Sequence, residues 1–151
     1  MVDLSKTGIR LKILYAFINL LTFFKTIRPK MDIKNCDFHC PHCTGKLNAD
    51  GFIMLNTRRQ SGEEGTIRLA TTFGNYEYLH EPRIDFNQGE IVAFNCPSCK
   101  QHVHSEKYKD YAILKMHVTD KIIFDVLFSR EAGKRRTYIV TEDGIESYSE
   151  M

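Results

Sequence analysis

The sequence predicts a mainly β fold from residue 32 onward, preceded by a short N-terminal hydrophobic helix. Three observations lead to this prediction. Short runs rich in β-branched and aromatic residues, each bounded by turn residues, follow one another along most of the chain. Two matched tetrapeptides, Cys40-Pro41-His42-Cys43 and Cys96-Pro97-Ser98-Cys99, lie 52 residues apart. Residues 13–24, in contrast, are apolar on nearly every helical face.

Length and charge indicate one domain with an appendage. A chain of 151 residues with 42% hydrophobic and 26% charged residues is typical of a single soluble domain. Residues 1–30 carry six Lys or Arg and one Asp (net +5), whereas residues 31–151 carry fifteen Lys or Arg and eighteen Asp or Glu (net −3). We therefore expect residues 1–30 to be an extension and residues 31–151 to be the folded domain, which lacks the overall basic charge of a nucleic-acid-binding module.

The extension has several interpretations. Its apolar stretch is short for a membrane span, which needs about 20 residues, and Lys25-Thr26-Ile27 offers no small-residue cleavage site for a signal peptide. A helix lying in a membrane interface or against a partner fits the pattern, and membrane contact would then involve residues 9–27 only. Met31 could also be the true start, which would make residues 1–30 non-native.

Four strands are expected between the cysteine pairs. The first, residues 52–57, follows the turn at residues 48–51, and the second, residues 66–71, follows the turn at residues 61–65. Residues 75–79 and 90–94 complete what the pattern indicates is a meander, and the last of these strands leads into the second cysteine pair. The long connection is therefore predicted to be a structured β insert.

The C-terminal third predicts a second antiparallel meander. Residues 111–118 and 122–128 are joined by a turn at Thr119-Asp120, and residues 131–134 return the chain to a strand at 136–140. The basic run Lys134-Arg135-Arg136 is interpreted as a solvated hairpin tip. The residues from Thr141 onward are polar and acidic, and we expect them to fray.

The paired tetrapeptides indicate a metal-ion site. Two Cys-x-x-Cys turns can present four thiolates at the corners of a tetrahedron, as in structural zinc sites, and such thiols favour a reducing compartment such as the cytoplasm. Pro41 and Pro97 pre-set φ in each turn, and Gly45 is expected to close the first turn, for which the second has Gln101 instead. The fifth cysteine, Cys36, is predicted to be a partly buried thiol outside the site or a substitute ligand.

These motifs resemble the zinc-ribbon superfamily, in which two cysteine knuckles on β-hairpins share one tetrahedral zinc ion. The arrangement is most similar to small, largely uncharacterised bacterial proteins with a β-rich insert between two Cys-Pro-x-Cys knuckles, and the resemblance covers residues 36–104 best. It implies one Zn(II) per chain with Cys40, Cys43, Cys96 and Cys99 as ligands. The connection between the pairs is longer than in an ordinary ribbon.

Three other chemistries use similar residues. Cys-Pro-His-Cys is also the active-site tetrapeptide of thioredoxin-like oxidants, but such a site needs a helix after the motif, and turn residues follow Cys43. Iron in a rubredoxin-like site takes the same four cysteines. A catalytic zinc would recruit histidine, and His39, His42, His102 and His104 all lie near the knuckles, where we interpret them as surface or supporting side chains.

The sequence thus favours a non-catalytic zinc-binding protein that serves as a protein-interaction or adaptor module for an unidentified protein partner. A nucleic-acid-binding zinc ribbon is the first alternative, and a thiol-disulfide oxidoreductase is the second. If the metal ion holds the ends of the insert together, its removal should loosen residues 36–104.

Overall fold

The computed structural model describes residues 36–149, so the predicted N-terminal helix within residues 1–30 lies outside the described part. Within residues 36–149 there is no helix, and therefore none that could span a membrane. The strands are β1 (Asp37–His39), β2 (Asn48–Ala49), β3 (Phe52–Arg58), β4 (Glu64–Ala70), β5 (Tyr78–Glu81), β6 (Ala93–Asn95), β7 (Tyr111–Thr119), β8 (Ile122–Ser129), β9 (Arg136–Thr141) and β10 (Gly144–Ser149).

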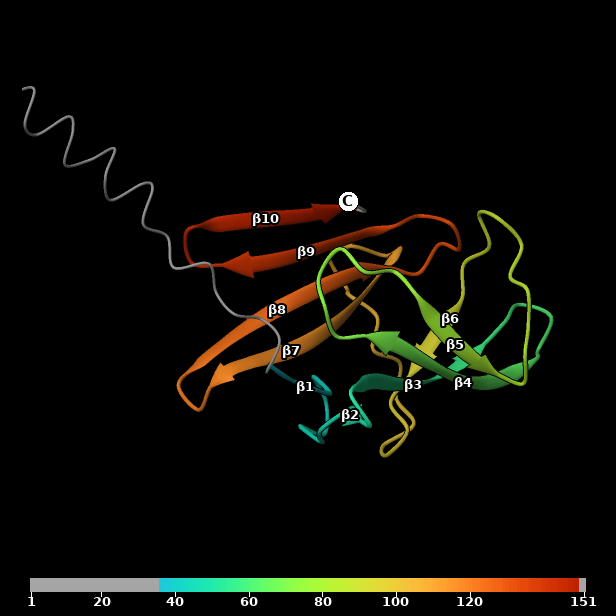
Figure 1. The fold of residues 1–151 in the computed structure, drawn as a ribbon, viewed down its shortest axis with the longest axis horizontal. Coiled ribbons are helices and arrows are strands. Elements are labelled where there is room, and N and C mark those ends of the chain that lie inside the picture. The colour runs from blue at the N-terminus through green and yellow to red at the C-terminus, as the bar shows by residue number, and fades with distance from the viewer. Residues whose placement is uncertain (1–35, 150–151) are drawn as a thin grey trace, which may run out of the picture. The chain divides into compact units, whose positions relative to one another are not determined.

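The first antiparallel sheet has the strand order β1-β7-β8-β9-β10 (Figure 1). The C-terminal meander predicted from the sequence is therefore confirmed. The prediction that the chain frays from Thr141 is wrong, because β10 pairs with β9 along its whole length, from Gly144 opposite Thr141 to Ser149 opposite Arg136. Tyr148 anchors this strand: its ring lies 5.0 Å from that of Phe73, between ring centres.

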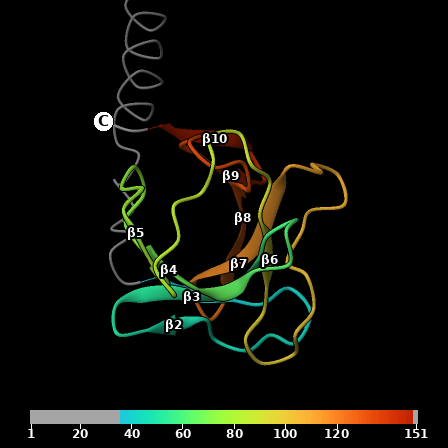
Figure 2. The same ribbon diagram turned by 90° about the vertical axis from the view of Figure 1, so that its right-hand side faces the viewer.

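The second sheet has the order β2-β3-β4-β5, with β6 also paired to β3. The insert is thus a structured β module, as predicted, but it is not a simple meander. β6 pairs with β3, with Asn95 opposite Asn56. β2 and β6 therefore lie along the same edge of β3, at different positions. Figure 2 shows β2 and β3 running below β7 and β8, so that the two sheets face each other.

The core lies between the inner faces of the two sheets. In β3 the alternation buries Ile53, Leu55 and Thr57, and in β7 it buries Leu114 and Met116 together with the alanine at position 112. Leu55, Leu114 and Met116 are completely buried. A strand that has one face against the core and the other face outward buries every second residue in this way.

A histidine is buried in the second sheet. The Nε2 atom of His80 lies 2.6 Å from the hydroxyl of Thr57, and its Nδ1 atom lies 2.5 Å from the carbonyl oxygen of Pro82. Both ring nitrogens are therefore satisfied, as burial of a polar side chain demands. The ring lies over Gly65 in the neighbouring strand, where a Cβ atom would be 2.4 Å from Cε1 of His80 and 2.6 Å from the carbonyl oxygen of Glu81.

Substitution of Gly65 by alanine should therefore destabilise the protein. The added methyl group has no room beside a hydrogen-bonded ring and a strand carbonyl, and overpacking of this kind costs about 1–3 kcal/mol. Urea denaturation of Gly65→Ala should show a loss at the upper end of that range. The exposed neighbour Glu64 offers a matched control, since Glu64→Ala should change the unfolding free energy by less than about 0.5 kcal/mol; equal losses in the two variants would contradict this account.

Candidate metal centre

The two cysteine knuckles each join one sheet to the other. The first leaves β1 of the first sheet and returns as β2 of the second. The second leaves β6 of the second sheet and reaches β7 of the first. There Ile113 donates its backbone N–H to the carbonyl of Val103, and His104 forms an antiparallel β-bridge with Ala112. In Figures 1 and 2 the loop after β6 comes down beside the loop between β1 and β2. The knuckles therefore meet where the sheets are linked.

The first knuckle is closed by its own backbone. The amide of Cys40 donates to the carbonyl of Gly45 over 3.0 Å, and the amide of Thr44 donates to the carbonyl of Cys40 over 3.0 Å. Thr44 has φ of 60°, in the left-handed region that a β-branched residue rarely adopts. The tight turn brings both cysteine side chains of the knuckle to the same side.

The second knuckle repeats this backbone almost atom for atom. The amide of Cys96 donates to the carbonyl of Gln101 over 2.9 Å, the amide of Lys100 donates to the carbonyl of Cys96 over 3.0 Å, and Lys100 has φ of 66°. In both knuckles the left-handed residue directly follows the second cysteine. The two turns are thus conformationally equivalent.

The role assigned to Gly45 from the sequence is therefore corrected. The left-handed position is Thr44, not Gly45, so the second turn needs no glycine at Gln101. Gly45 matters for space instead: a Cβ atom there would lie 3.2 Å from the Sγ atom of Cys43 and 3.9 Å from the hydroxyl oxygen of Ser98 in the other knuckle. A small residue keeps room beside the sulfur.

The four knuckle cysteines form a compact sulfur cluster. Their Sγ atoms all lie within 4.8 Å of one another, with Cys40 at 3.8 Å from Cys99 and Cys43 at 3.7 Å from Cys96. A tetrahedron with metal–sulfur bonds of about 2.3 Å has edges of about 3.8 Å, whereas a disulfide would bring two sulfurs to about 2.05 Å. The four cysteines are thus positioned to bind one metal ion.

The cluster has a buried side and an exposed side. Cys40 and Cys96, the first residue of each pair, are 1% and 0% exposed, whereas Cys43 is exposed and Cys99 is half-buried. The sulfur of Cys40 accepts a hydrogen bond from the amide of His42 over 3.4 Å. The inner half of the site is therefore enclosed by the fold, and its outer half faces solvent.

The thiols of the inner pair differ in acidity. Burial raises the pKa of Cys40 to about 12. Burial opposes ionisation of Cys96 as well, but hydrogen bonds from the amides of Cys99 and Ser98 and from neighbouring thiols lower its pKa to about 7. A thiolate at Cys40 beside that of Cys96 therefore needs a cation in the cluster to offset the two negative charges. This is what is expected of a metal-binding site.

The four histidines near the knuckles are not part of the sulfur cluster, which contains only cysteines among the described residues. His42 lies 2.8 Å through Nε2 from the carbonyl oxygen of His102 and so joins the two knuckles, and His39 contacts the carbonyl of Thr44 through Nδ1 at 2.8 Å. The rings of His102 and His104 stack, with their centres 4.8 Å apart. His39 and His42 therefore support the turns, whereas the rings of His102 and His104 contact each other.

Cys36 also lies outside the cluster. It is 5% exposed and packs in the core, and its carbonyl oxygen accepts a hydrogen bond from the side-chain amide of Asn48 over 3.3 Å. The sequence allowed Cys36 to be either a thiol outside the site or a substitute ligand, and the structure places it among the core residues rather than with the four sulfurs.

Acid should weaken the fold through His104. Its Nε2 accepts a hydrogen bond from the Phe94 amide over 3.3 Å, and burial, with the charges of Arg130 and His102, lowers its pKa to about 4. A histidine whose pKa is depressed in the fold binds more protons when unfolded. Its contribution to stability is therefore complete above about pH 6.5 and is lost as the pH falls towards 4.

After allowance for solvent screening, this contribution is on the order of 1 kcal/mol. Urea unfolding of the metal-loaded protein between about pH 7 and 4.5 should be less pH-dependent in His104→Gln than in the parent, whereas His102→Gln should keep most of the dependence. A pH profile that His104→Gln leaves unchanged would assign the acid sensitivity to other groups.

No family model, curated protein or solved structure matches this chain. The fold and the site together define its class, which is a mainly β protein of two antiparallel sheets with four cysteines positioned to bind one metal ion.

Proposed function

We propose that the chain is a non-catalytic zinc protein of the zinc-ribbon type, in which one structural Zn(II) stabilises a protein-interaction module. The observation that carries the proposal is the cluster of four Sγ atoms within 4.8 Å, because these sulfurs supply all the ligands of a tetrahedral ion. Structural zinc sites are closed in this way. The same thiols would stay reduced in the cytoplasm, which is the compartment we propose.

A non-catalytic role agrees with the surroundings of the sulfurs. A catalytic zinc keeps a position for water or substrate and is usually held by histidine or carboxylate. Here two of the imidazoles near the knuckles have other partners: His42 lies against the carbonyl oxygen of His102, and His104 accepts a hydrogen bond from the backbone amide of Phe94. A thiol-disulfide role is also less well supported, because no helix follows either pair of cysteines in residues 36–149.

The surface supports a protein partner rather than a nucleic acid. Among the described strands β10 pairs only with β9, which leaves its outer edge open to another chain, and Ile145 on it is 55% exposed. The basic run Lys134-Arg135-Arg136 is less suited to bind phosphate than its composition suggests, because the charge of Lys134 is paired with the carboxylate of Glu131 at 3.4 Å. An interaction through the edge of β10 is therefore the version we favour.

Native mass spectrometry of the full chain purified from its own host tests this proposal. We expect one zinc ion per chain, together with a co-purifying protein. Cys99→Ser should lose the ion, whereas Cys36→Ser, which removes a thiol outside the cluster, should keep it. Iron in place of zinc, an ion retained by Cys99→Ser, or nucleic acid in place of the protein partner would each contradict part of the proposal.

A further inference from the structure

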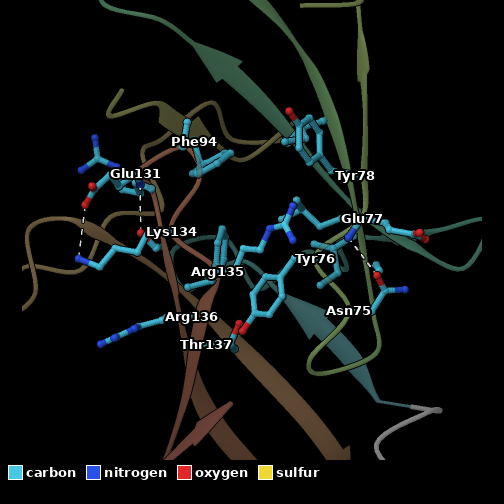
Figure 3. A pocket seen from close by; sticks show the side chains of 18 of the residues that line it. Asn75, Tyr76, Glu77, Tyr78, Phe94, Glu131, Lys134, Arg135, Arg136 and Thr137 are labelled. Atoms are coloured by element: carbon cyan, nitrogen blue, oxygen red, sulfur yellow. Dashed lines mark hydrogen bonds and ion pairs between the residues drawn. The ribbon is translucent and has the colours of Figure 1, made fainter. Parts of the chain in front are cut away.

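A cavity of about 400 Å³ lies between the two sheets, and none of the four clustered cysteines lines it. Its walls come from the inner faces of both sheets, with Leu69 of β4 on one side and Phe128 of β8 on the other. Its rim is formed by residues 74–78 and 131–135 (Figure 3). We propose that this cavity is a binding site for a small aromatic carboxylate, a role separate from that of the metal site.

The walls favour an aromatic ligand. Five phenylalanines line the cavity: Phe38, Phe73, Phe86, Phe94 and Phe128. Two of their ring pairs are tilted, with centres 6.3 Å apart for Phe38 and Phe73 and 5.5 Å apart for Phe94 and Phe128. Tilted rings at such spacings offer both faces and edges to a further ring, and aromatic contacts of this kind add to the gain from apolar burial.

The rim supplies one charged group directed over the cavity. Figure 3 shows Arg135 extending across it towards the segment that carries Tyr76 and Glu77, whereas Lys134 turns to Glu131 and Arg136 points away. Arg135 already takes part in an interaction of its own, so a ligand carboxylate would share or replace that contact. A guanidinium binds a carboxylate through two parallel N–H donors, which selects an acid over a neutral analogue.

The opposite rim is fixed in place. The hydroxyl of Tyr76 donates to the carbonyl oxygen of Tyr148 over 2.8 Å, and the amide of Glu77 donates to Oδ1 of Asn75 over 2.9 Å. The segment facing Arg135 is thereby tied to β10, and the cavity is already formed without a ligand. Its volume falls within the range of about 300–1,000 Å³ that is common for small-molecule sites, so an acid with two fused rings fits the space.

Titration of isotopically labelled, zinc-loaded full-length protein with 2-naphthoate, followed by amide NMR shifts, tests the proposal. We expect saturable shifts centred on residues 67–78 and 128–137. The neutral analogue 2-naphthamide, and 2-naphthoate with Arg135→Gln, should bind about tenfold more weakly or worse, because each loses a charge-assisted hydrogen bond. Arg136→Gln removes a neighbouring charge that points away from the cavity and should bind as the parent does, within about twofold.

Absence of saturable shifts up to the solubility limit of 2-naphthoate would overturn the proposal. So would equal binding of the acid and the amide, an equal loss in the two arginine variants, or shifts centred outside the cavity. Should Arg135→Gln fail to fold, the comparison of acid with amide on the parent protein decides the matter. The outcome does not depend on the identity of the bound metal, which the mass measurement tests separately.

Discussion

Removal of the metal ion is expected to unfold the corner where the two sheets meet. Binding to a structural four-cysteine site supplies on the order of 10 kcal/mol of folding free energy, which exceeds the net stability of many domains. Without a cation, the buried sulfurs of Cys40 and Cys96 must be protonated or remain as uncompensated thiolates next to each other. Chelation, or the substitution Cys96→Ser, should therefore lower the thermal midpoint steeply and reduce the β signal in circular dichroism.

Loss of the metal ion should loosen more of the fold than residues 36–104, the segment that the sequence alone indicates. Residues 36–104 form the segment between and around the knuckles, but β1 pairs with β7 and Val103 bonds to Ile113, so loss of the ion also releases one edge of the C-terminal sheet. Cys36→Ser is the matched control, since it alters a buried cysteine outside the cluster and should keep its response to the chelator. A melting curve that chelation leaves unchanged would contradict a structural role for the metal.

Truncation of Phe38 is expected to have the second largest effect. Phe38 is 2% exposed, lies in β1 two residues before Cys40, and contacts the ring of Phe73. Its amide donates to Oδ1 of Asn48 over 2.6 Å, and its carbonyl accepts the amide of Leu47 over 2.7 Å, so it joins both arms of the first knuckle. Phe38→Ala should cost about 3–5 kcal/mol through lost burial and the cavity it leaves.

Urea denaturation of the zinc-loaded protein measures this loss. Tyr78→Ala is a suitable control, because Tyr78 is an aromatic residue with 46% of its surface exposed and should cost less than about 1 kcal/mol. A loss below about 1 kcal/mol for Phe38→Ala as well would mean that the core relaxes around β1, and that this strand does not hold the knuckle against the sheets.

The parts of the fold that sequence reasoning recovers are those with a local signal. Short runs rich in β-branched and aromatic residues and bounded by turns predicted β3 and β7 closely, because strands favour these residue types and end at turns. The grouping of Cys40 and Cys43 with Cys96 and Cys99 followed from spacing, since each pair of cysteines shares one tight turn. The bounds shifted where that signal was weak: the strand expected at 75–79 is β5, Tyr78–Glu81, whose inward residue is His80.

The remaining features depend on contacts distant in sequence. The pairing of β10 with β9 outweighs a polar composition, and the three-residue strand β1 pairs along its whole length with β7, which lies more than 70 residues later in the chain. The left-handed positions Thr44 and Lys100 carry no glycine, so composition could not indicate them. The position of Arg135 over a cavity likewise follows from the packing of one sheet on the other, for which the sequence pattern of a hairpin tip gives no evidence.

Hydrogen–deuterium exchange of the zinc-loaded and the chelated protein tests most directly whether one metal ion joins the two sheets. We expect chelation to remove protection from both knuckles and from the strands on either side of them, β3 and β6 in one sheet and β1 and β7 in the other, while β9 retains the most. Protection lost in the knuckle turns alone, with β3 and β7 unchanged, would contradict the account.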